Sequence, residues 1–343
     1  MQDFSKKNSE SKKIKFPSEL RFDLVSKDWV VIATGRGRRP ESFSQERRRA
    51  EKISEKKCPF CNIKAQETPI LEYKNKKGEW SVVVIPNKFP AFSKGEFLKQ
   101  RQVGPYRVMD GVGHCEIVIT RDHYRQFAQL SVGEMRQVLD AYHERYLDLM
   151  NEKFINYVSI FHNHGREAGA SIAHPHSQII AHPLIDPDLK NSLAGSKNFW
   201  KKHKKRCVHC AMLDWDKKDG QRIIFENKKF LVLVPFTSRM AFETRIYPKE
   251  HLAYFERIEI DEKDYLAEAF QTVLYKLYKG LNNPPYNFFL HTAPCDGRNY
   301  DHYHWHWEIL PKTSVWAGFE LGTGIEISTI EPEKAAEYLK HIQ

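Results

Sequence analysis

The 343-residue chain lacks any apolar run near the roughly 20 residues that a membrane-spanning helix needs, which excludes that class of protein. Its first fifteen residues are rich in lysine, serine and glutamate and lack the apolar core of a secretory signal peptide. We therefore expect residues 1–16 to form a disordered basic tail, and the protein to be cytoplasmic. With 41% hydrophobic residues, the remainder can bury one large core or two smaller ones.

Acidic residues are fewer than basic ones, 44 against 54, so the net charge is +10. A positive field of this kind attracts phosphorylated small molecules and nucleic acid alike. Composition alone does not decide between these two classes of partner. It also does not exclude that the positive charge serves only to keep the protein soluble.

Cysteine is also scarce, and the spacing of the six residues matters more than their number. Cys58 and Cys61 form one C-x-x-C pair, and Cys207 and Cys210 form another. In a chain without a secretory signal, this spacing favours metal binding or redox chemistry over a disulfide framework.

A four-part pattern occurs twice along the chain. Each copy has a C-x-x-C pair, an apolar strand, a segment that ends in histidine, and a strand with alternating histidines. These parts lie at residues 58–61, 80–85, 116–123 and 174–180, and again at 207–210, 230–234, 243–251 and 304–310. The third and fourth parts are 51 residues apart in the first copy (His123 to His174) and 53 in the second (His251 to His304). The pattern predicts a duplicated module, with repeats at 17–195 and 196–343.

The predicted fold class is α+β with mostly antiparallel strands and one long helix before the histidine strand of each repeat. Residues 131–154 begin with the capping box Ser131 to Glu134 and continue with apolar residues at helical spacing, and residues 261–280 match them. Segment 86–113 is expected to be an insertion or loop, and 184–188 and 195–198 the connection between repeats. Strands are predicted at 29–33, 80–85, 115–120, 157–162, 230–235 and 287–291.

Two zinc sites follow from the repeated spacing, because zinc favours four thiolate and imidazole ligands in a tetrahedron. One set is Cys58, Cys61, His123 and His174, and the other is Cys207, Cys210, His251 and His304. With all four positions filled by protein, both metals would be structural, the second being the less certain because His209 could compete as a ligand.

His176 is the predicted nucleophile, because it shares a strand face with His174 and stays free if His174 binds metal. A neutral imidazole nitrogen attacks an α-phosphorus well near pH 7, and Gln178 on the same face can donate to a phosphoryl oxygen. The second repeat has Glu308 in place of Gln178. An ionised carboxylate cannot donate and repels phosphate, so we predict that this repeat carries no nucleophile.

At these residues the chain resembles the galactose-1-phosphate uridylyltransferase family of the histidine-triad-like superfamily. The resemblance covers most of residues 20–325, and its motifs are residues 28–40, Cys58-Pro-Phe-Cys61, residues 86–90 and His174-Pro-His176-Ser-Gln178. It implies a histidine-triad-like fold for each repeat. It also implies homodimers and a two-step exchange in which His176 takes a nucleoside monophosphate from a nucleotide sugar and passes it to a phosphorylated acceptor.

The same resemblance implies nucleotide or phosphate contacts at Arg36, Arg39, Asn87, Asn163 and Ser171. The second C-x-x-C, the serine after His176 and residues 317–324 resemble the branch that contains ADP-glucose phosphorylase. The first interpretation is uridylyl transfer between UDP-glucose and galactose 1-phosphate. The alternatives are an ADP-glucose phosphorylase, a dinucleoside polyphosphate phosphorylase and, more remotely, a non-enzymatic zinc module that binds nucleic acid.

Overall fold

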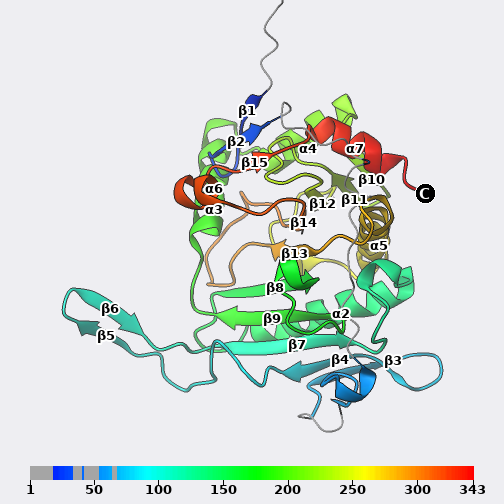
Figure 1. The fold of residues 1–343 in the computed structure, drawn as a ribbon. Coiled ribbons are helices and arrows are strands. Elements are labelled where there is room, and N and C mark those ends of the chain that lie inside the picture. Colours follow the sequence, from blue (N-terminus) through cyan, green and yellow to red (C-terminus); the bar gives the residue numbers. More distant parts are fainter. Residues whose placement is uncertain (1–17, 34–40, 42–53, 64–67) are drawn as a thin grey trace, which may run out of the picture.

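The computed structural model describes residues 18–33, 41, 54–63 and 68–343, and its centre is a ten-stranded antiparallel sheet (Figure 1). The strand order is β10-β11-β12-β14-β13-β8-β9-β7-β4-β3. The bounds are β3 (Leu71–Lys74), β4 (Trp80–Pro86), β7 (His114–Thr120), β8 (Tyr157–His164), β9 (His176–His182), β10 (Ile223–Glu226), β11 (Phe230–Leu233), β12 (Thr244–Pro248), β13 (Tyr286–His291) and β14 (His306–Pro311).

The sheet consists of two halves with the same order of elements along the chain. In each half two outer strands form a hairpin, a third strand and a long helix follow, and the last two strands lie toward the centre. The halves join where β8 pairs with β13, with Asn163 opposite Asn287. The predicted α+β class, with antiparallel strands and a duplicated unit, is confirmed.

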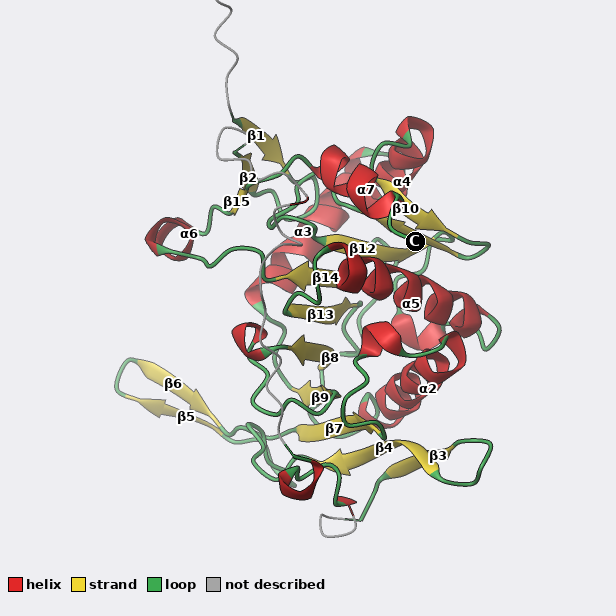
Figure 2. Ribbon diagram, turned by 45° about the vertical axis from the view of Figure 1, so that its right-hand side comes forward, coloured by secondary structure: helices red, strands yellow, loops and turns green. Residues whose placement is uncertain are grey.

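The long helices α2 (Val132–Leu149) and α5 (Glu262–Gly280) cover the same face of the sheet (Figure 2). Large aromatic side chains fill the space between helices and sheet: Phe270 meets Trp307 edge-on at 5.1 Å between ring centroids, and Tyr142 lies 5.8 Å from Trp307. All three are fully buried. Burial of this apolar surface is the main force that holds the two halves against their helices.

Strand alternation sends every second residue to the other face. In β9, Ser177 and Ile179 are fully buried on the helix side, whereas Gln178 is only half-buried on the opposite side. The same alternation puts His176 and Gln178 together on the face away from the helices; the sequence predicted that they share a face but not which face it is.

Segment 86–113, expected to be an insertion or loop, contains a two-stranded hairpin of β5 (Gln100–Val103) and β6 (Tyr106–Met109). The chain reverses at Gly104, whose φ of 58° is one that glycine adopts without strain. A further small sheet is formed by β1 (Glu19–Phe22), β2 (Trp29–Ile32) and β15 (Ile327–Ser328).

The segment expected to connect the repeats is largely helical: α3 spans Pro187–Lys202. Asp186 caps it by accepting a hydrogen bond from the Leu189 amide at 2.9 Å. Gly195 lies inside this helix. The position requires glycine, because a Cβ there would come within 1.9 Å of the Val25 carbonyl oxygen. This glycine allows close packing and does not mark a loop, and the predicted repeat boundary at 195 falls within α3.

Shorter helices complete the described part of the chain. These are α4 (Val208–Asp219), α6 (Gly318–Thr323) and α7 (Pro332–Lys340), with 3-10 turns η2 (Glu55–Lys57), η4 (Phe127–Gln129), η5 (Arg166–Ala168) and η6 (Phe255–Arg257). None of the described helices combines the length and the apolar character that crossing a membrane requires.

The predicted capping box at the start of α2 is present. The Ser131 hydroxyl accepts from the Glu134 amide, and the Glu134 carboxylate accepts from the Ser131 amide at 2.8 Å.

We expect Ser131→Ala to lower the free energy of unfolding by about 1 kcal/mol, because a helical N–H loses its acceptor. Urea unfolding measures this. Ser131→Thr, which keeps the hydroxyl, should stay near the wild-type value, and equal losses for both variants would contradict the capping role.

Candidate active site and metal centres

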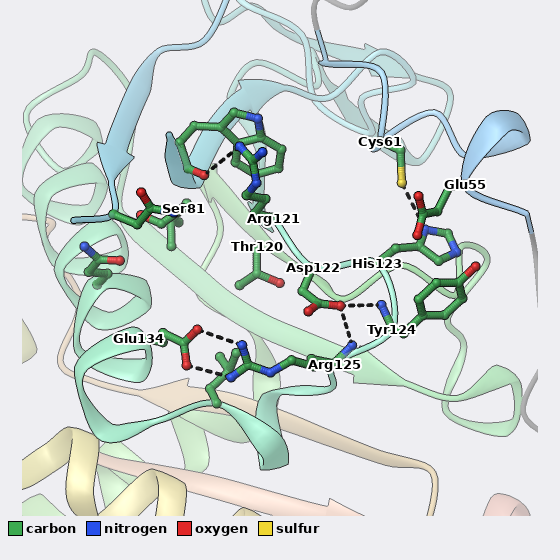
Figure 3. A pocket seen from close by; sticks show the side chains of 15 residues that line it. Glu55, Cys61, Ser81, Thr120, Arg121, Asp122, His123, Tyr124, Arg125 and Glu134 are labelled. Carbon is green, nitrogen blue, oxygen red and sulfur yellow. Dashed lines mark hydrogen bonds and ion pairs between the residues drawn. The ribbon is translucent and has the colours of Figure 1, made fainter. Parts of the chain in front are cut away.

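Cys58, Cys61, His123 and His174 converge, as predicted, where β7 ends and β9 begins. The Cys61 sulfur lies 3.1 Å from His123 Nδ1 and 3.5 Å from His174 Nδ1, and the two Nδ1 atoms are 3.3 Å apart. Figure 3 shows Cys61 and His123 facing each other beside a cavity. Chain segments more than 100 residues apart thus present two thiols and two imidazoles to one point.

These distances fit a tetrahedral zinc ion. With zinc–sulfur bonds of about 2.3 Å and zinc–nitrogen bonds of about 2.0–2.1 Å, sulfur and nitrogen ligands are about 3.5 Å apart and two nitrogens about 3.3 Å apart. His174 also donates from Nε2 to the Thr120 carbonyl at 2.7 Å, which fixes the ring so that Nδ1 faces the cysteines.

The second half repeats this arrangement with Cys207, Cys210, His251 and His304. The Cys210 sulfur lies 3.4 Å from His251 Nδ1 and 3.5 Å from His304 Nδ1. The Nε2 atom of His251 donates to the Asp301 carbonyl, and that of His304 to the Pro248 carbonyl. Both groups therefore offer the same kinds of atoms, and the matching histidines His174 and His304 are held by the same kind of outer hydrogen bond.

His209 lies outside this second group, although the sequence left it open as a competing ligand. Its ring is almost fully buried, and neither ring nitrogen has a hydrogen-bond partner among the described residues. It packs 5.2 Å from the ring of His306 and lines a cleft over the sheet.

His176 is the first residue of β9 and is 7% exposed. Its Nδ1 donates to the His174 carbonyl at 2.8 Å, so the neutral ring carries its proton on Nδ1 and its lone pair on Nε2. Burial lowers the pKa of His176 below the ordinary 6.5, which keeps the ring neutral at pH 7. A neutral imidazole in a fixed tautomer is ready for nucleophilic attack.

Phe60, between the first two cysteines, connects the metal group to His176. Its ring meets His176 edge-on at 5.0 Å and His174 at 5.9 Å. The side chain is buried in a small apolar cluster with Ile117 and Ile119. Sequence reasoning missed this residue, since an aromatic inside a C-x-x-C gives no signal of what it will pack against.

Of the five residues predicted to contact nucleotide or phosphate, the structure describes Asn87, Asn163 and Ser171. Asn163 accepts at 2.8 Å from the Asn287 amide of the neighbouring half, and that amide also donates to the Ala168 carbonyl. Asn87 holds its own turn by accepting from the Phe89 amide, and Ser171 is exposed. Arg36 and Arg39 lie outside the described residues.

The second half has different chemistry at the matching positions. Strand pairing places His291 and His306 where the first half has Asn163 and His176. Glu308 is buried and forms ion pairs with Arg239 and Arg245, the latter at 3.2 Å. The donor atoms of His291, His306 and Glu308 also lie close together, but two arginines on one carboxylate disfavour a cation there.

Two cavities adjoin these groups. A cleft of about 720 Å³ lies over the face away from the helices and is lined by residues that include Phe161, Asn163, Phe289 and Glu308. The cavity of about 620 Å³ in Figure 3 borders the first metal group. The two arginines that line the 620 Å³ cavity are paired with carboxylates, Arg121 with Glu79 at 2.9 Å and Arg125 with Glu134 at 2.7 Å. Those arginines are therefore poorly placed to bind a phosphate.

Comparison with known proteins agrees with this geometry. The family described as galactose-1-phosphate uridyl transferase, N-terminal domain, matches residues 7–185. The chain belongs to this family. A second family, described only as a domain of unknown function, matches residues 107–342. The resemblance drawn from the sequence motifs is confirmed.

Two curated relatives illustrate the two branches of this family. An ADP-glucose phosphorylase of Arabidopsis thaliana is 30% identical over 331 residues, covering 94% of this chain and 93% of the relative. A galactose-1-phosphate uridylyltransferase of Thermotoga maritima is 28% identical over 335 residues, covering 95% and 98%.

Solved structures show the same fold. The structure of the Arabidopsis ADP-glucose phosphorylase with bound ADP-glucose has a TM-score of 0.79 at 27% identity, covering 95% of this chain and 99% of that one. A uridylyltransferase structure has a TM-score of 0.72 at 27% identity, covering 94% and 97%. The chain is thus a nucleotidyltransferase-type enzyme, which leaves the non-enzymatic interpretation without support.

The ion pairs of Glu308 are buried, so breaking them has a large expected cost. We expect Glu308→Ala to lower the free energy of unfolding by about 3–5 kcal/mol, because Arg245 then keeps its charge in the interior with one partner fewer. Urea unfolding measures the loss. The control is Asp214→Ala, which breaks an exposed pair with Arg206 and should cost less than about 1 kcal/mol. Similar losses for both variants would contradict this account.

Proposed function

We propose that this chain transfers a uridylyl group from UDP-glucose to a hexose 1-phosphate, galactose 1-phosphate in the first instance, through a covalent nucleotidyl-His176. The observation that carries the proposal is the neutral His176 ring, whose Nδ1 donates to the carbonyl of His174 while His174 faces the cysteines. Family membership supports the reaction class, and the uridylyltransferase relatives support the substrate pair.

The first step forms a bond between His176 Nε2 and the α-phosphorus. The bond from that phosphorus to the bridging oxygen breaks, and the sugar 1-phosphate leaves as a stable anion with the electron pair. Gln178, on the same strand face, donates to a non-bridging oxygen as charge builds there. A phosphate oxygen of the acceptor then attacks phosphorus, and the electron pair of the N–P bond returns to Nε2. Neither step needs a strong general acid.

Asn163, Asn87 and Ser171 are proposed to contact the nucleotide or its phosphates, together with Arg36 and Arg39. Asn163 is the best supported of the described residues, because Asn287 holds its side chain on the face that carries Gln178. Guanidinium groups at 36 and 39 would balance the charge of a diphosphate.

Zinc is the metal we propose for both Cys–Cys–His–His groups, on the ligand distances given above. It would link the C-x-x-C segments to the strands and would hold Phe60 against His176, with no role as a Lewis acid.

We also propose a homodimer, repeats at 17–195 and 196–343, and a cytoplasmic location.

The second candidate reaction is adenylyl transfer from ADP-glucose to phosphate. A specific observation favours it, since the relative that is 30% identical is an ADP-glucose phosphorylase. The covalent step at His176 would be the same, and only the base and the acceptor would differ.

The test of the proposal is the mass of the protein after brief mixing with UDP-glucose or ADP-glucose in the absence of acceptor. We expect a uridylyl adduct on His176 and a fall in turnover of about 10³-fold or more for His176→Ala, because the nucleophile is gone. An adenylyl adduct would favour the second reaction.

The matched control for the nucleophile is His306→Ala, the corresponding histidine of the second repeat. It should still form the adduct once circular dichroism has shown that it folds. Full turnover by His176→Ala, or an adduct on another residue, would overturn the assignment of the nucleophile.

Metal removal tests the structural role of zinc. We expect two zinc ions per chain by elemental analysis, and we expect a chelator to lower the melting temperature and the rate of adduct formation together, with zinc restoring both. A chelator that abolished turnover while the melting temperature stayed unchanged would show that the metal acts in the chemistry.

A further inference from the structure

His162 lies behind the proposed nucleophile, on the face of the sheet that the helices cover. It stands opposite the buried Ser177 in the last pair between β8 and β9, and opposite residues share a face. The side chain of His162 is 1% exposed, and its Nδ1 lies 2.8 Å from the backbone carbonyl oxygen of His176. A carbonyl oxygen only accepts hydrogen bonds. His162 therefore donates from Nδ1 to the backbone of His176.

The second ring nitrogen of His162 makes no such bond. Its Nε2 is buried and has no hydrogen-bond partner among the residues that the structure describes. Burial lowers the pKa of His162 well below the ordinary 6.5, so the ring is neutral at pH 7 and carries one proton. That single proton is committed to the His176 carbonyl.

Packing alone does not account for an imidazole at this position. The ring is stacked on Phe127 at 4.3 Å between centroids and on Phe288 at 4.9 Å, with interplanar angles of 18° and 20°. A phenyl ring would fill the same space and would leave no buried nitrogen unpaired, which costs free energy. What the imidazole adds between the two phenylalanines is the donor at Nδ1.

Two buried hydroxyl groups lie beside this donor. The Oγ atom of Ser177 is 3.3 Å from His162 Nδ1 and shares a hydrogen bond with the Tyr142 hydroxyl, which comes from α2. Both side chains are fully buried. These contacts connect the start of β9 to α2 and form a small polar group within an otherwise apolar layer, next to the Nδ1 edge of the imidazole.

The second half of the sheet provides an internal comparison. His306 Nδ1 donates to the His304 carbonyl at 3.1 Å, which repeats the bond that fixes the tautomer of His176. The position of His162, however, is taken by Leu290, which stands opposite the residue that follows His306. A leucine side chain cannot donate a hydrogen bond. The half without the proposed nucleophile therefore keeps the histidine and lacks the donor behind it.

We propose that His162 is a positioning residue for the nucleotidyl transfer, acting through the backbone of His176. Its bond holds the His176 carbonyl from the helix side, while the bond from His176 Nδ1 to the His174 carbonyl holds the ring. Together they aim Nε2 at the place where the α-phosphorus would lie, and a small error in such an alignment is costly in rate. The inference rests on the proposed function and adds to it a residue on the face of the sheet away from the substrate.

The experiment mixes the full chain with saturating UDP-glucose or ADP-glucose and follows adduct formation on His176 by rapid quench and mass spectrometry. His162→Phe keeps the stacked ring and removes the donor. Its melting temperature should stay near the wild-type value. Its rate constant of adduct formation should fall at least about tenfold, with an unchanged half-saturating concentration of nucleotide sugar. His162→Leu, which copies Leu290 of the second half, tests the same loss if His162→Phe does not fold.

The rescue variant is His162→Asn. Its side-chain amide nitrogen can take the place of Nδ1, but the side chain cannot stack between Phe127 and Phe288. This variant should melt at a lower temperature and still form the adduct within about threefold of the wild-type rate. A side chain that only packs would give the reverse order, with the phenylalanine variant fast and the asparagine variant slow.

The matched control is His143→Phe, which removes another histidine-to-carbonyl bond on the helix side, from Nε2 to Glu256 at 3.0 Å. It should leave the rate constant of adduct formation unchanged. A wild-type rate in His162→Phe or His162→Leu, or equal slowing in the phenylalanine and asparagine variants, would overturn the positioning role. A wild-type chain that forms no adduct on His176 would instead overturn the proposed function, so the two failures are distinguishable.

Discussion

The position of β9 between β7 and β8 is the constraint on which the rest of the site depends. Hydrogen bonding on both sides fixes its register, with His176 opposite Ile119 and Gln178 opposite Ile117 and Phe161. A slip of one residue would send both side chains into the helix-covered core. The ladder therefore determines which face His176, the proposed nucleophile, occupies before any ligand or metal is present.

Backbone carbonyls then decide what each histidine can do. The Thr120 carbonyl takes the Nε2 proton of His174 and turns its Nδ1 toward the cysteines, whereas the His174 carbonyl takes the Nδ1 proton of His176 and leaves its Nε2 for chemistry. Two histidines only two residues apart, His174 just before β9 and His176 at its first position, thus acquire opposite tautomers. Phe60 packs against both rings and so lies between the proposed metal site and the proposed nucleophile.

Duplication explains why the two halves are alike in structure and different in chemistry. Each half keeps the ligand group, the long helix and a histidine in the nucleophile position. In the second half, Glu308 and Arg245 replace Gln178 and Ile117, and their ion pair occupies the place where the first half has an amide donor. One sheet therefore holds the proposed reactive centre in its first half and, at the matching positions of its second half, an ion pair.

The sequence by itself determined the α+β class, the repeat, both Cys–Cys–His–His groups and the strand face that His176 shares with Gln178, because two-residue strand alternation and C-x-x-C spacing are local properties of the chain. Tertiary structure alone decided the helical course of α3 through Gly195, the packing of Phe60 and the pairing of Glu308 with Arg239. Each of those depends on atoms from distant segments, such as the Val25 carbonyl beside Gly195, whose approach no local pattern encodes.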